Sequence, residues 1–390
     1  MLAIWLCFVG LAEPTLLSSF QIVAAGDTLV HRRVKKTART KNIIDENGVT
    51  QNNGGFDWLL EDVAPILQQA DIAFVNLESP TDPDFHRRIR GEVFNAPVEF
   101  LGALSTAGFD VLSFANNHSY DQKSEGLVRT LTEIENRDMT AIGAGRSCAD
   151  AKKIHIVKVD AIRVGFLAIT DLLNINENTG EETPCVYLPG PKCQQNCTPD
   201  RDAIWYHIDE NALISDIQAA KRQVDVLILS FHWGIEYRTK PLSLYTALAP
   251  KLMEHGVDVL LGHHPHVLQP VVRHTRSNGD EGVIAYSLGN FFSDMGKKYG
   301  MYPTSTTRGK TRDGILLSID IAVYQLENGQ RKITIPKLAP IPIWTENANS
   351  NDNPQIRVRR HSTILKEDPS RKAFVEKRRQ AMSFIEGLSD

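Results

Sequence analysis

Three histidines fall within four consecutive positions, in the segment GHHPH at residues 262–266. A polar cluster of this density has little structural purpose, whereas neutral imidazole is the commonest metal ligand in proteins. The His-x-His spacing favours His264 and His266 as metal ligands and leaves His263 as a candidate for substrate contact. This segment is the most specific chemical signal in the sequence.

The other candidate ligands share one feature, because each closely follows a short run rich in Val, Ile, Leu, Ala and Phe. They are Asp27 after residues 20–26, Glu78 after 72–77, Asn117 after 111–115 and His232 after 224–231. With the histidines they supply oxygen and imidazole donors without thiolate, a set that suits Mn, Fe, Zn or Mg. We therefore expect one or two divalent metal ions, and Asp27 or Glu78 would bridge a pair of them.

A candidate proton-transfer pair follows the same strand end as Asn117. His118 is the next residue, so its imidazole would project towards the substrate as a general acid or an electrostatic stabiliser. Asp121, three residues further on, would orient that imidazole. The residues expected to contact substrate are His263, Asn116, Glu236 and Asn290.

The apolar runs predict the elements that position these side chains. Continuous runs of this length are typical of strands buried on both faces. Helical patterns alternate with them, at residues 56–69, 98–107, 126–134, 211–221 and 244–255. Strand and helix alternation predicts an α/β fold with a largely parallel or mixed sheet. Because ligands bind at the carboxyl ends of such strands, the candidate ligands should converge on one edge.

Each candidate also has a purely structural explanation. Asp27 follows a glycine and could cap a turn, Glu78 precedes a Ser-Pro pair that ends its strand, and His232 could be a core histidine. The convergence of several such residues favours the functional interpretation. The sequence has no Gly-x-Ser-x-Gly elbow, P-loop or Gly-x-Gly-x-x-Gly after a strand, so serine-hydrolase and nucleotide-binding chemistries fit less well.

Composition bounds the class of protein. The 390 residues are 42% hydrophobic and 23% charged, which is typical of a globular protein. The net charge of -4 argues against nucleic acid as a partner, because phosphate binding needs a basic surface. We expect the basic cluster of Arg357, Arg359, Arg360 and His361 to be a solvated face.

The five cysteines leave three alternatives open. Cys185, Cys193 and Cys197 share one polar segment, whereas Cys148 and Cys7 stand apart. The first alternative is a disulfide in the loop, which would favour an oxidising compartment. The second is free thiols, and the third is half of a zinc site at Cys193 and Cys197.

The chain ends suggest three parts. Residues 1–12 are apolar but lack a basic start and are shorter than the roughly 18 residues of a membrane span, so a signal, a short anchor and a buried segment all remain open. We expect residues 1–19 to be such a signal or anchor remnant, 20–340 to be the main domain with an inserted loop at 172–202, and 341–390 to be a polar linker and C-terminal helix. An extracytoplasmic, membrane-anchored location is expected, with the cytoplasm as the alternative.

The motifs, taken in order, resemble those of the CapA/PgsA family of bacterial poly-γ-glutamate capsule synthesis proteins. The matching segments are GD at 26–27, NLE at 76–78, ANNH at 115–118, HWG at 232–234, GHHPH at 262–266 and SLGNF at 287–291. The resemblance covers about residues 20–294 and implies an αββα sandwich similar to calcineurin-like metallophosphoesterases. It also implies that Asn117 binds metal, His118 serves catalysis, and His232, His264 and His266 are ligands.

Two positions depart from the metallophosphoesterase pattern. That pattern opens with Asp-x-His, but Leu29 stands where the histidine would be, and Glu78 stands where an aspartate is usual. One metal site is therefore a ligand short, and His31 is a candidate to replace it.

Three functions compete. The first is a metal-dependent hydrolase or transferase acting on a γ-glutamyl polymer or a related amide. The second is a non-catalytic accessory or export subunit that binds the anionic polymer or docks on membrane capsule-synthase subunits. The third is a metallophosphoesterase. Fold analogy cannot choose among them.

Overall fold

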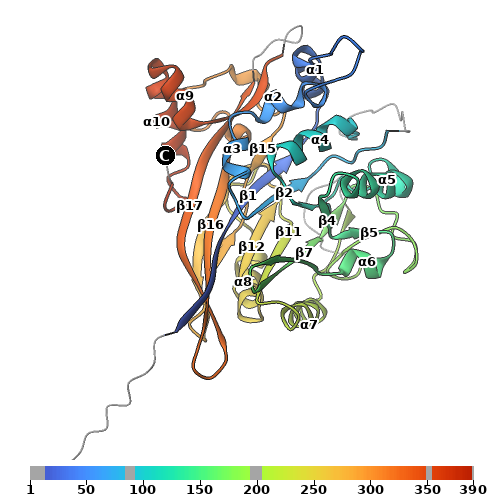
Figure 1. The fold of residues 1–390 in the computed structure, drawn as a ribbon, viewed down its shortest axis with the longest axis vertical. Coiled ribbons are helices and arrows are strands. Elements are labelled where there is room, and N and C mark those ends of the chain that lie inside the picture. The colour runs from blue at the N-terminus through green and yellow to red at the C-terminus, as the bar shows by residue number, and fades with distance from the viewer. Residues whose placement is uncertain (1–13, 84–92, 194–203, 348–353, 389–390) are drawn as a thin grey trace, which may run out of the picture.

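The computed structural model describes residues 14–83, 93–193, 204–347 and 354–388, and its fold is built on two β-sheets that lie against each other (Figure 1). One sheet has eight strands and the other has six. A single hydrophobic core includes Ile22 and Ala24 from the first sheet and Val226 and Ile228 from the second. The predicted layered α/β sandwich with mixed sheets is confirmed.

In the eight-stranded sheet, β1 is central and joins a parallel half to an antiparallel half. The order is β18 (Ile356–Arg360), β17 (Arg331–Asn347), β16 (Asp313–Gln325), β1 (Thr15–Thr28), β2 (Ile72–Leu77), β3 (Val111–Ser113) and β4 (Thr140–Ile142), and β15 (Asn290–Phe292) also pairs with β1. β1 is parallel to β2 and antiparallel to β16.

The six-stranded sheet is parallel in its centre and antiparallel at both edges. Its order is β13 (Val271–Thr275), β14 (Glu281–Ala285), β12 (Val259–His263), β11 (Val226–His232), β7 (Ile162–Thr170) and β6 (His155–Val159). Side chains alternate along β11 as the pleat requires. Val226 and Ile228 face the shared core, while Leu227 and Leu229 belong to a second core under two helices.

Helices cover the sheets and match the predicted patterns closely. They are α1 (Arg32–Lys41), α2 (Phe56–Leu60), α3 (Ala64–Leu67), α4 (Val98–Ala107), α5 (Lys123–Glu135), α6 (Cys148–Lys152), α7 (Glu210–Lys221), α8 (Ser243–Glu254), α9 (His361–Glu367) and α10 (Lys372–Ala381). The helix predicted over 56–69 is divided into α2 and α3, where Pro65 begins a new helical turn. Among the described residues, no helix has the length and apolar character needed to cross a bilayer.

Both expected chain-end boundaries differ from the structure. β1 begins at Thr15, and Thr15 already pairs with Gln325 of β16, so the segment expected to end at residue 19 overlaps the sheet. Residues 1–13 lie outside the described part. The boundary expected at residue 340 falls inside β17, and residues 356–360 form β18 rather than a linker.

The expected solvated basic face near residue 360 is wrong. Arg359 is only 3% exposed, and its guanidinium forms ion pairs with Asp62, Glu346 and Glu367. These carboxylates come from three different parts of the chain, and their charges allow the guanidinium of Arg359 to be buried.

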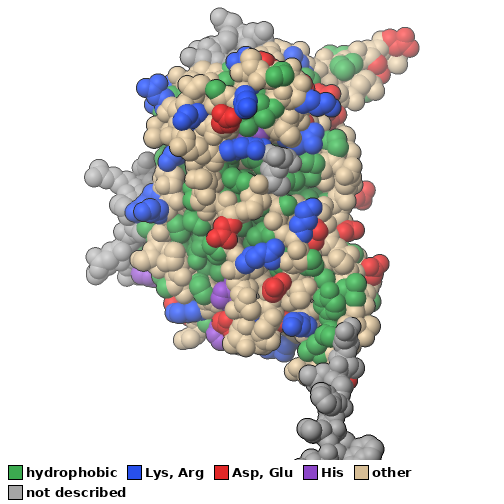
Figure 2. All heavy atoms as spheres, turned by 90° about the vertical axis from the view of Figure 1, so that its left-hand side faces the viewer, with side chains coloured by type: hydrophobic (Ala, Val, Ile, Leu, Met, Phe, Trp, Pro, Cys, Tyr) green, Lys and Arg blue, Asp and Glu red, His purple; other side chains and the backbone are tan. Residues whose placement is uncertain are grey.

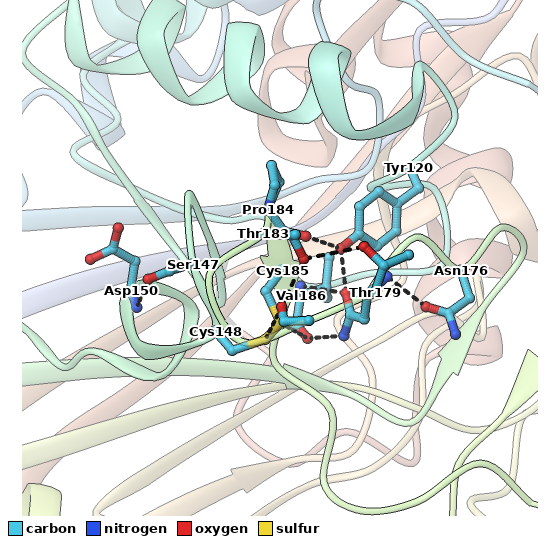
Figure 3. The surroundings of a disulfide bond; sticks show 12 residues. Tyr120, Ser147, Cys148, Asp150, Asn176, Thr179, Thr183, Pro184, Cys185 and Val186 are labelled. Carbon is cyan, nitrogen blue, oxygen red and sulfur yellow. Dashed lines mark hydrogen bonds between the residues drawn. A yellow bond between two sulfur atoms is a disulfide. The ribbon is translucent and has the colours of Figure 1, made fainter.

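The segment expected as an inserted loop carries short strands and a disulfide. Leu172–Leu173 (β8) pairs with Ile204–Trp205 (β10), and Cys185–Val186 (β9) pairs with Ala144–Gly145 (β5). Cys185 is bonded to Cys148, the first residue of α6 (Figure 3). The predicted disulfide is therefore present, but its partner comes from outside the polar segment. Cys193 is also disulfide-bonded, and Cys197 lies outside the described residues.

Candidate metal centre

The candidate site lies where the carboxyl ends of strands from both sheets meet. Asp27, near the end of β1, pairs with Asn76 of β2 and with Asn290 of β15. In the other sheet, β11 and β12 end side by side, with His232 paired to His263. The Nδ1 atom of His263 lies 3.1 Å from Oδ1 of Asp27, so the two sheets touch at their ligand-bearing ends.

Asp27 is completely buried and contacts four partners. Its Oδ1 accepts a hydrogen bond from Nδ2 of Asn76 at 2.8 Å. Its Oδ2 accepts the backbone N–H of His264 at 3.1 Å and lies 3.3 Å from Nδ1 of His266. Burial alone would raise the pKa of Asp27, but hydrogen bonds with His263 and His266 hold it well below its ordinary value. Asp27 is therefore a carboxylate fixed in one orientation.

Gly26 allows this position of Asp27. A Cβ atom at residue 26 would lie 1.9 Å from the carbonyl oxygen of Gly289. The backbone N–H of Asp27 donates to that same carbonyl at 3.0 Å. A larger residue would therefore push β1 away from the segment that precedes Asn290.

Glu78 is fully buried, and neither carboxylate oxygen has a hydrogen-bond partner among the described residues. Its Oε1 lies 3.6 Å from Nε2 of His232 and 3.8 Å from Nε2 of His266. Burial and the negative charge of Asp27 raise the pKa of Glu78 well above its ordinary value. A carboxyl group in such a place is costly unless a proton or a cation neutralises it.

His264 and His266 both adopt left-handed backbone conformations, with φ of 93° and 55°. Such values are uncommon outside glycine and cluster at functional sites. Neither ring nitrogen of His264 has a partner among the described residues, and burial followed by the charge of His266 lowers its pKa to about 3. For His266, Glu78 and Asp27 outweigh burial and raise its pKa to about 10.

His232 brings Asn117 into the cluster. Its Nε2 lies 2.9 Å from Oδ1 of Asn117, and burial together with the charge of His264 keeps the pKa of His232 well below its ordinary value. Imidazole must be neutral to bind a metal, so both His232 and His264 are in the binding form.

Among the residues that the structure describes, three groups place ligand atoms within 4.8 Å of one another. They are Glu78 with His232 and His264, Asp27 with Glu78 and His266, and Glu236 with His264 and His266. Glu78 belongs to two groups, which suits the bridging role predicted for it. Glu236, expected to contact substrate, lies with two predicted ligands in the third group.

His118 lies beside this cluster, in a setting that fixes its imidazole. Its Nδ1 is 2.8 Å from Oδ2 of Asp121 and 3.5 Å from Nδ2 of Asn174. The edge of Phe94 meets the ring, with centroids 4.7 Å apart. Asp121 also accepts the backbone N–H of Phe94 at 2.6 Å, so the predicted orienting carboxylate is itself held in place.

The remaining predicted residues support the cluster from its edges. Asn116 donates to the carbonyl of Leu77 at 2.8 Å, and Oδ1 of Asn290 lies 3.0 Å from Nδ1 of His266. His31 does not join the three ligand groups, and its Nδ1 lies 3.2 Å from the backbone N–H of Asp294. His31 therefore does not replace the histidine missing after Asp27.

Two asparagines contact the site without having been predicted to do so. Asn76 bonds Asp27, and its position inside an apolar run buried on both faces was a usable signal. Asn174 bonds Asn117 through its side chain at 3.3 Å and through its backbone N–H at 3.0 Å. Asn174 lies in a segment without periodicity, where the sequence carries no such signal.

The buried atoms fit a divalent cation. Both oxygens of Glu78, both ring nitrogens of His264 and Nε2 of His263 lack hydrogen-bond partners among the described residues. Buried polar atoms are rarely left in this state. Oxygen and imidazole donors without thiolate are the set that Mn, Fe and Zn accept. A cation would displace the protons that the raised pKa values of Glu78 and His266 retain.

Residues 21–295 match the family model described as "Bacterial capsule synthesis protein PGA_cap". The match covers more than half of the chain and includes every candidate site residue. The chain belongs to this PGA_cap family. The capsule-synthesis family inferred from the ordered motifs is thus confirmed.

Two relatives of this PGA_cap chain come from Bacillus. The capsule biosynthesis protein CapA of Bacillus anthracis is 29% identical over 279 residues, which are 70% of this chain and 59% of that protein. The PGA biosynthesis protein CapA of Bacillus subtilis (strain 168) is 31% identical over 274 residues, 70% and 62% respectively. This chain therefore spans less than two thirds of the length of these curated relatives.

A weaker likeness links the PGA_cap chain to a solved structure. A purple acid phosphatase isolated from yellow lupin seeds aligns over 83% of this chain and 55% of its own, with 12% identity and a TM-score of 0.31. A likeness at this level says nothing about the reaction of this chain.

Proposed function

We propose that this PGA_cap chain is a metal-dependent hydrolase or transferase that acts on a γ-glutamyl polymer or a related amide. One observation carries the proposal. The partnerless buried atoms of Glu78 and His264 lie beside an imidazole, His118, that a carboxylate already orients. Family membership supports capsule polymer as the material acted upon.

The residues divide the work between ion binding and proton transfer. Asp27, Glu78, His232, His264 and His266 would hold the ion or ions, with Asn117 beside His232. When bound, a divalent ion polarises the amide carbonyl and lowers the pKa of a bound water. Asp121 fixes a proton on Nδ1 of His118, which leaves Nε2 as the basic nitrogen. Nε2 would take a proton from the attacking water or amine and then pass it to the departing amine.

The first test is metal content by elemental analysis of the full chain. We expect about one or two equivalents of a transition metal. The double variant His264→Ala/His266→Ala should lose it, whereas the matched control His207→Ala/His274→Ala should keep it, with all three proteins folded by circular dichroism.

Turnover then tests the reaction itself. We expect the parent protein to shorten poly-γ-glutamate or transfer its chain end to an amine, and the double variant to do neither. Absence of metal in the parent protein after reconstitution with Mn, Fe and Zn would contradict the proposal. Turnover of generic phosphate esters with no action on the amide would favour a metallophosphoesterase.

The alternative is a non-catalytic accessory of a membrane capsule synthase. The burial of the site favours this non-catalytic role. Asn117 and His118 are each only 3% exposed, and a polymer would have to displace neighbouring residues to reach them. In that case the ligand variants would leave polymer production in cells unchanged while the protein stays folded. An extracytoplasmic location forms part of the proposal in either case, and the Cys148–Cys185 disulfide supports it.

A further inference from the structure

Two segments of the chain carry basic residues and no acidic ones. α1, with the sequence RRVKKTARTK, has six Lys or Arg among its ten residues. Residues 295–312 have five. The whole protein has a net charge of -4, so positive charge is concentrated in these segments. On the face that carries β17 and the C-terminal helices, by contrast, charges of both signs are scattered among hydrophobic side chains (Figure 2).

α1 adjoins the residues around His118, and the second segment begins beside α1. His31, directly before α1, meets Phe94 with ring centroids 5.0 Å apart, and Phe94 meets His118. Lys35 of α1 donates to the backbone carbonyl of Asn95 at 3.1 Å. Arg33 forms an ion pair with Asp294, the residue before the second segment. α1 is therefore joined through Phe94 to the proposed catalytic imidazole, and through Asp294 to the start of the second segment.

The two faces of α1 differ in what they do. Arg33, Val34, Thr37 and Ala38 are buried against the protein. The spacing of a helix places Arg32, Lys35, Lys36 and Arg39 on the other side. Arg32 and Arg39 are exposed, as are Lys297 and Lys298 in the second segment. We call Arg32, Lys35, Lys36, Arg39, Lys297 and Lys298 the basic rim.

Ion pairing within the described residues does not account for three cations of this rim. Within the described parts of the chain, no ion pair with a carboxylate involves Arg32, Lys35 or Arg39. Like charges four residues apart disfavour a helix, and so do cations in its first turn. Burial and the charge of Arg39 lower the pKa of Lys35, which shows that the cations already oppose one another. A helix that keeps Arg32, Lys35 and Arg39 without a carboxylate partner among the described residues is suited to an anionic ligand.

We infer that the basic rim binds a run of carboxylates and guides an anionic polymer to the metal centre. The choice of a γ-glutamyl polymer rests on the proposed function. A flexible chain with one carboxylate per residue can follow a short curved rim. A double-stranded nucleic acid is too stiff to follow a rim of this length.

The test measures binding rather than turnover, so it can fail independently of the proposed function. Fluorescently labelled poly-γ-glutamate is titrated with metal-free full-length protein, at low and at physiological salt, and anisotropy is recorded. The rim variants are Arg32→Glu/Arg39→Glu and Lys297→Glu/Lys298→Glu. The control, Lys158→Glu/Arg222→Glu, makes the same change of charge at exposed positions remote from the strand ends that carry the site.

Each rim variant should weaken binding about tenfold or more, and the control about twofold or less, because close charges act more strongly than the net charge. Arg32→Glu removes a like-charge contact with Lys36 and places an acid in the first turn of α1, so a fall in thermal stability should not accompany the loss. Two outcomes would overturn the inference. In one, the rim and control variants lose binding affinity equally. In the other, single-stranded DNA of equal charge binds as tightly as poly-γ-glutamate. The proposed function is tested separately, by the metal content and the turnover of His264→Ala/His266→Ala.

Discussion

His118 is held by Asp121, Asn174 and Phe94, and it belongs to none of the three described groups that could hold an ion. Its role can therefore be separated from metal binding. A ligand and a proton donor fail in different ways when they are replaced, and this chain allows both to be tested.

Replacing His118 with asparagine should abolish proton donation while the metal remains. We expect turnover of the γ-glutamyl substrate to fall by roughly 10²- to 10⁴-fold. The control His155→Asn, on the edge strand β6, should retain activity. Metal analysis completes the test, because loss of the ion with His118→Asn would make this residue a ligand instead.

The sequence indicated much of the site because the chemistry recurs at strand ends. Asp27, Glu78 and His232 each follow a buried run, and parallel strands bring such ends to one edge. Asn174 could not be found in this way. Its position depends on how a segment without periodicity crosses the site, which long-range contacts decide.

The segment from β8 to β9 is the element that brings Asn174 to the site. Glu177 accepts the backbone N–H of Ser124 at the start of α5, and Asn178 donates to the carbonyl of Val186 at 2.9 Å. Tyr120 donates to the carbonyl of Pro184 at 2.9 Å (Figure 3). The disulfide to α6 closes this arrangement at its far end.

Cys148→Ser/Cys185→Ser should loosen this segment. The bond closes a loop across a sequence separation of 37 residues. Loss of such a bond costs about 3–4 kcal/mol on a chain-entropy estimate, which should lower the thermal midpoint by several degrees. Limited proteolysis should find new cleavage between residues 174 and 184.

A reducing agent provides the control for the disulfide. It should lower the midpoint of the parent protein more than that of the double variant, which retains only the disulfide of Cys193. If the parent and the variant melt alike under oxidising conditions, the disulfide does not stabilise the fold.

Local patterns found most helices and strands but could not find β18. Its sequence, IRVRR, alternates apolar and basic residues and suggests a solvated strand or tail. It is an edge strand of the eight-stranded sheet, and Arg359 is buried because it reaches Asp62, Glu346 and Glu367, which the local pattern does not bring together. Cys148 was missed for the same reason, because the partner of a cysteine depends on spatial proximity in the fold.

At the scale of the whole molecule, stability should depend on pH through His361. This histidine is fully buried at the start of α9, and neither ring nitrogen has a partner among the described residues. Burial, followed by the charges of Arg379 and Arg378, lowers its pKa from 6.5 to about 3. Below pH 6.5 the unfolded chain therefore binds a proton that the folded protein refuses until about pH 3.

The stability that neutral His361 contributes is complete above pH 6.5 and is lost as the pH falls. The slope is about 1.4 kcal/mol per pH unit for one proton. His361→Leu should remove this dependence. In urea unfolding experiments, the free energy of unfolding of the variant should therefore rise relative to that of the parent protein as the pH falls from 6.5 to 4.5. The control His207→Gln, at an exposed position, should follow the parent. Parallel curves for His361→Leu and the parent would contradict the assignment.

The central place of β1 has a consequence for synthesis on the ribosome. β1 emerges first, yet its antiparallel neighbour β16 begins at residue 313, and the pairing joins residues about three hundred positions apart. Until that strand arrives, one edge of β1 has open hydrogen-bonding groups and apolar side chains, which other chains can bind. The candidate metal centre itself can be completed only after residues 259–266, which carry three of its histidines, have left the exit tunnel.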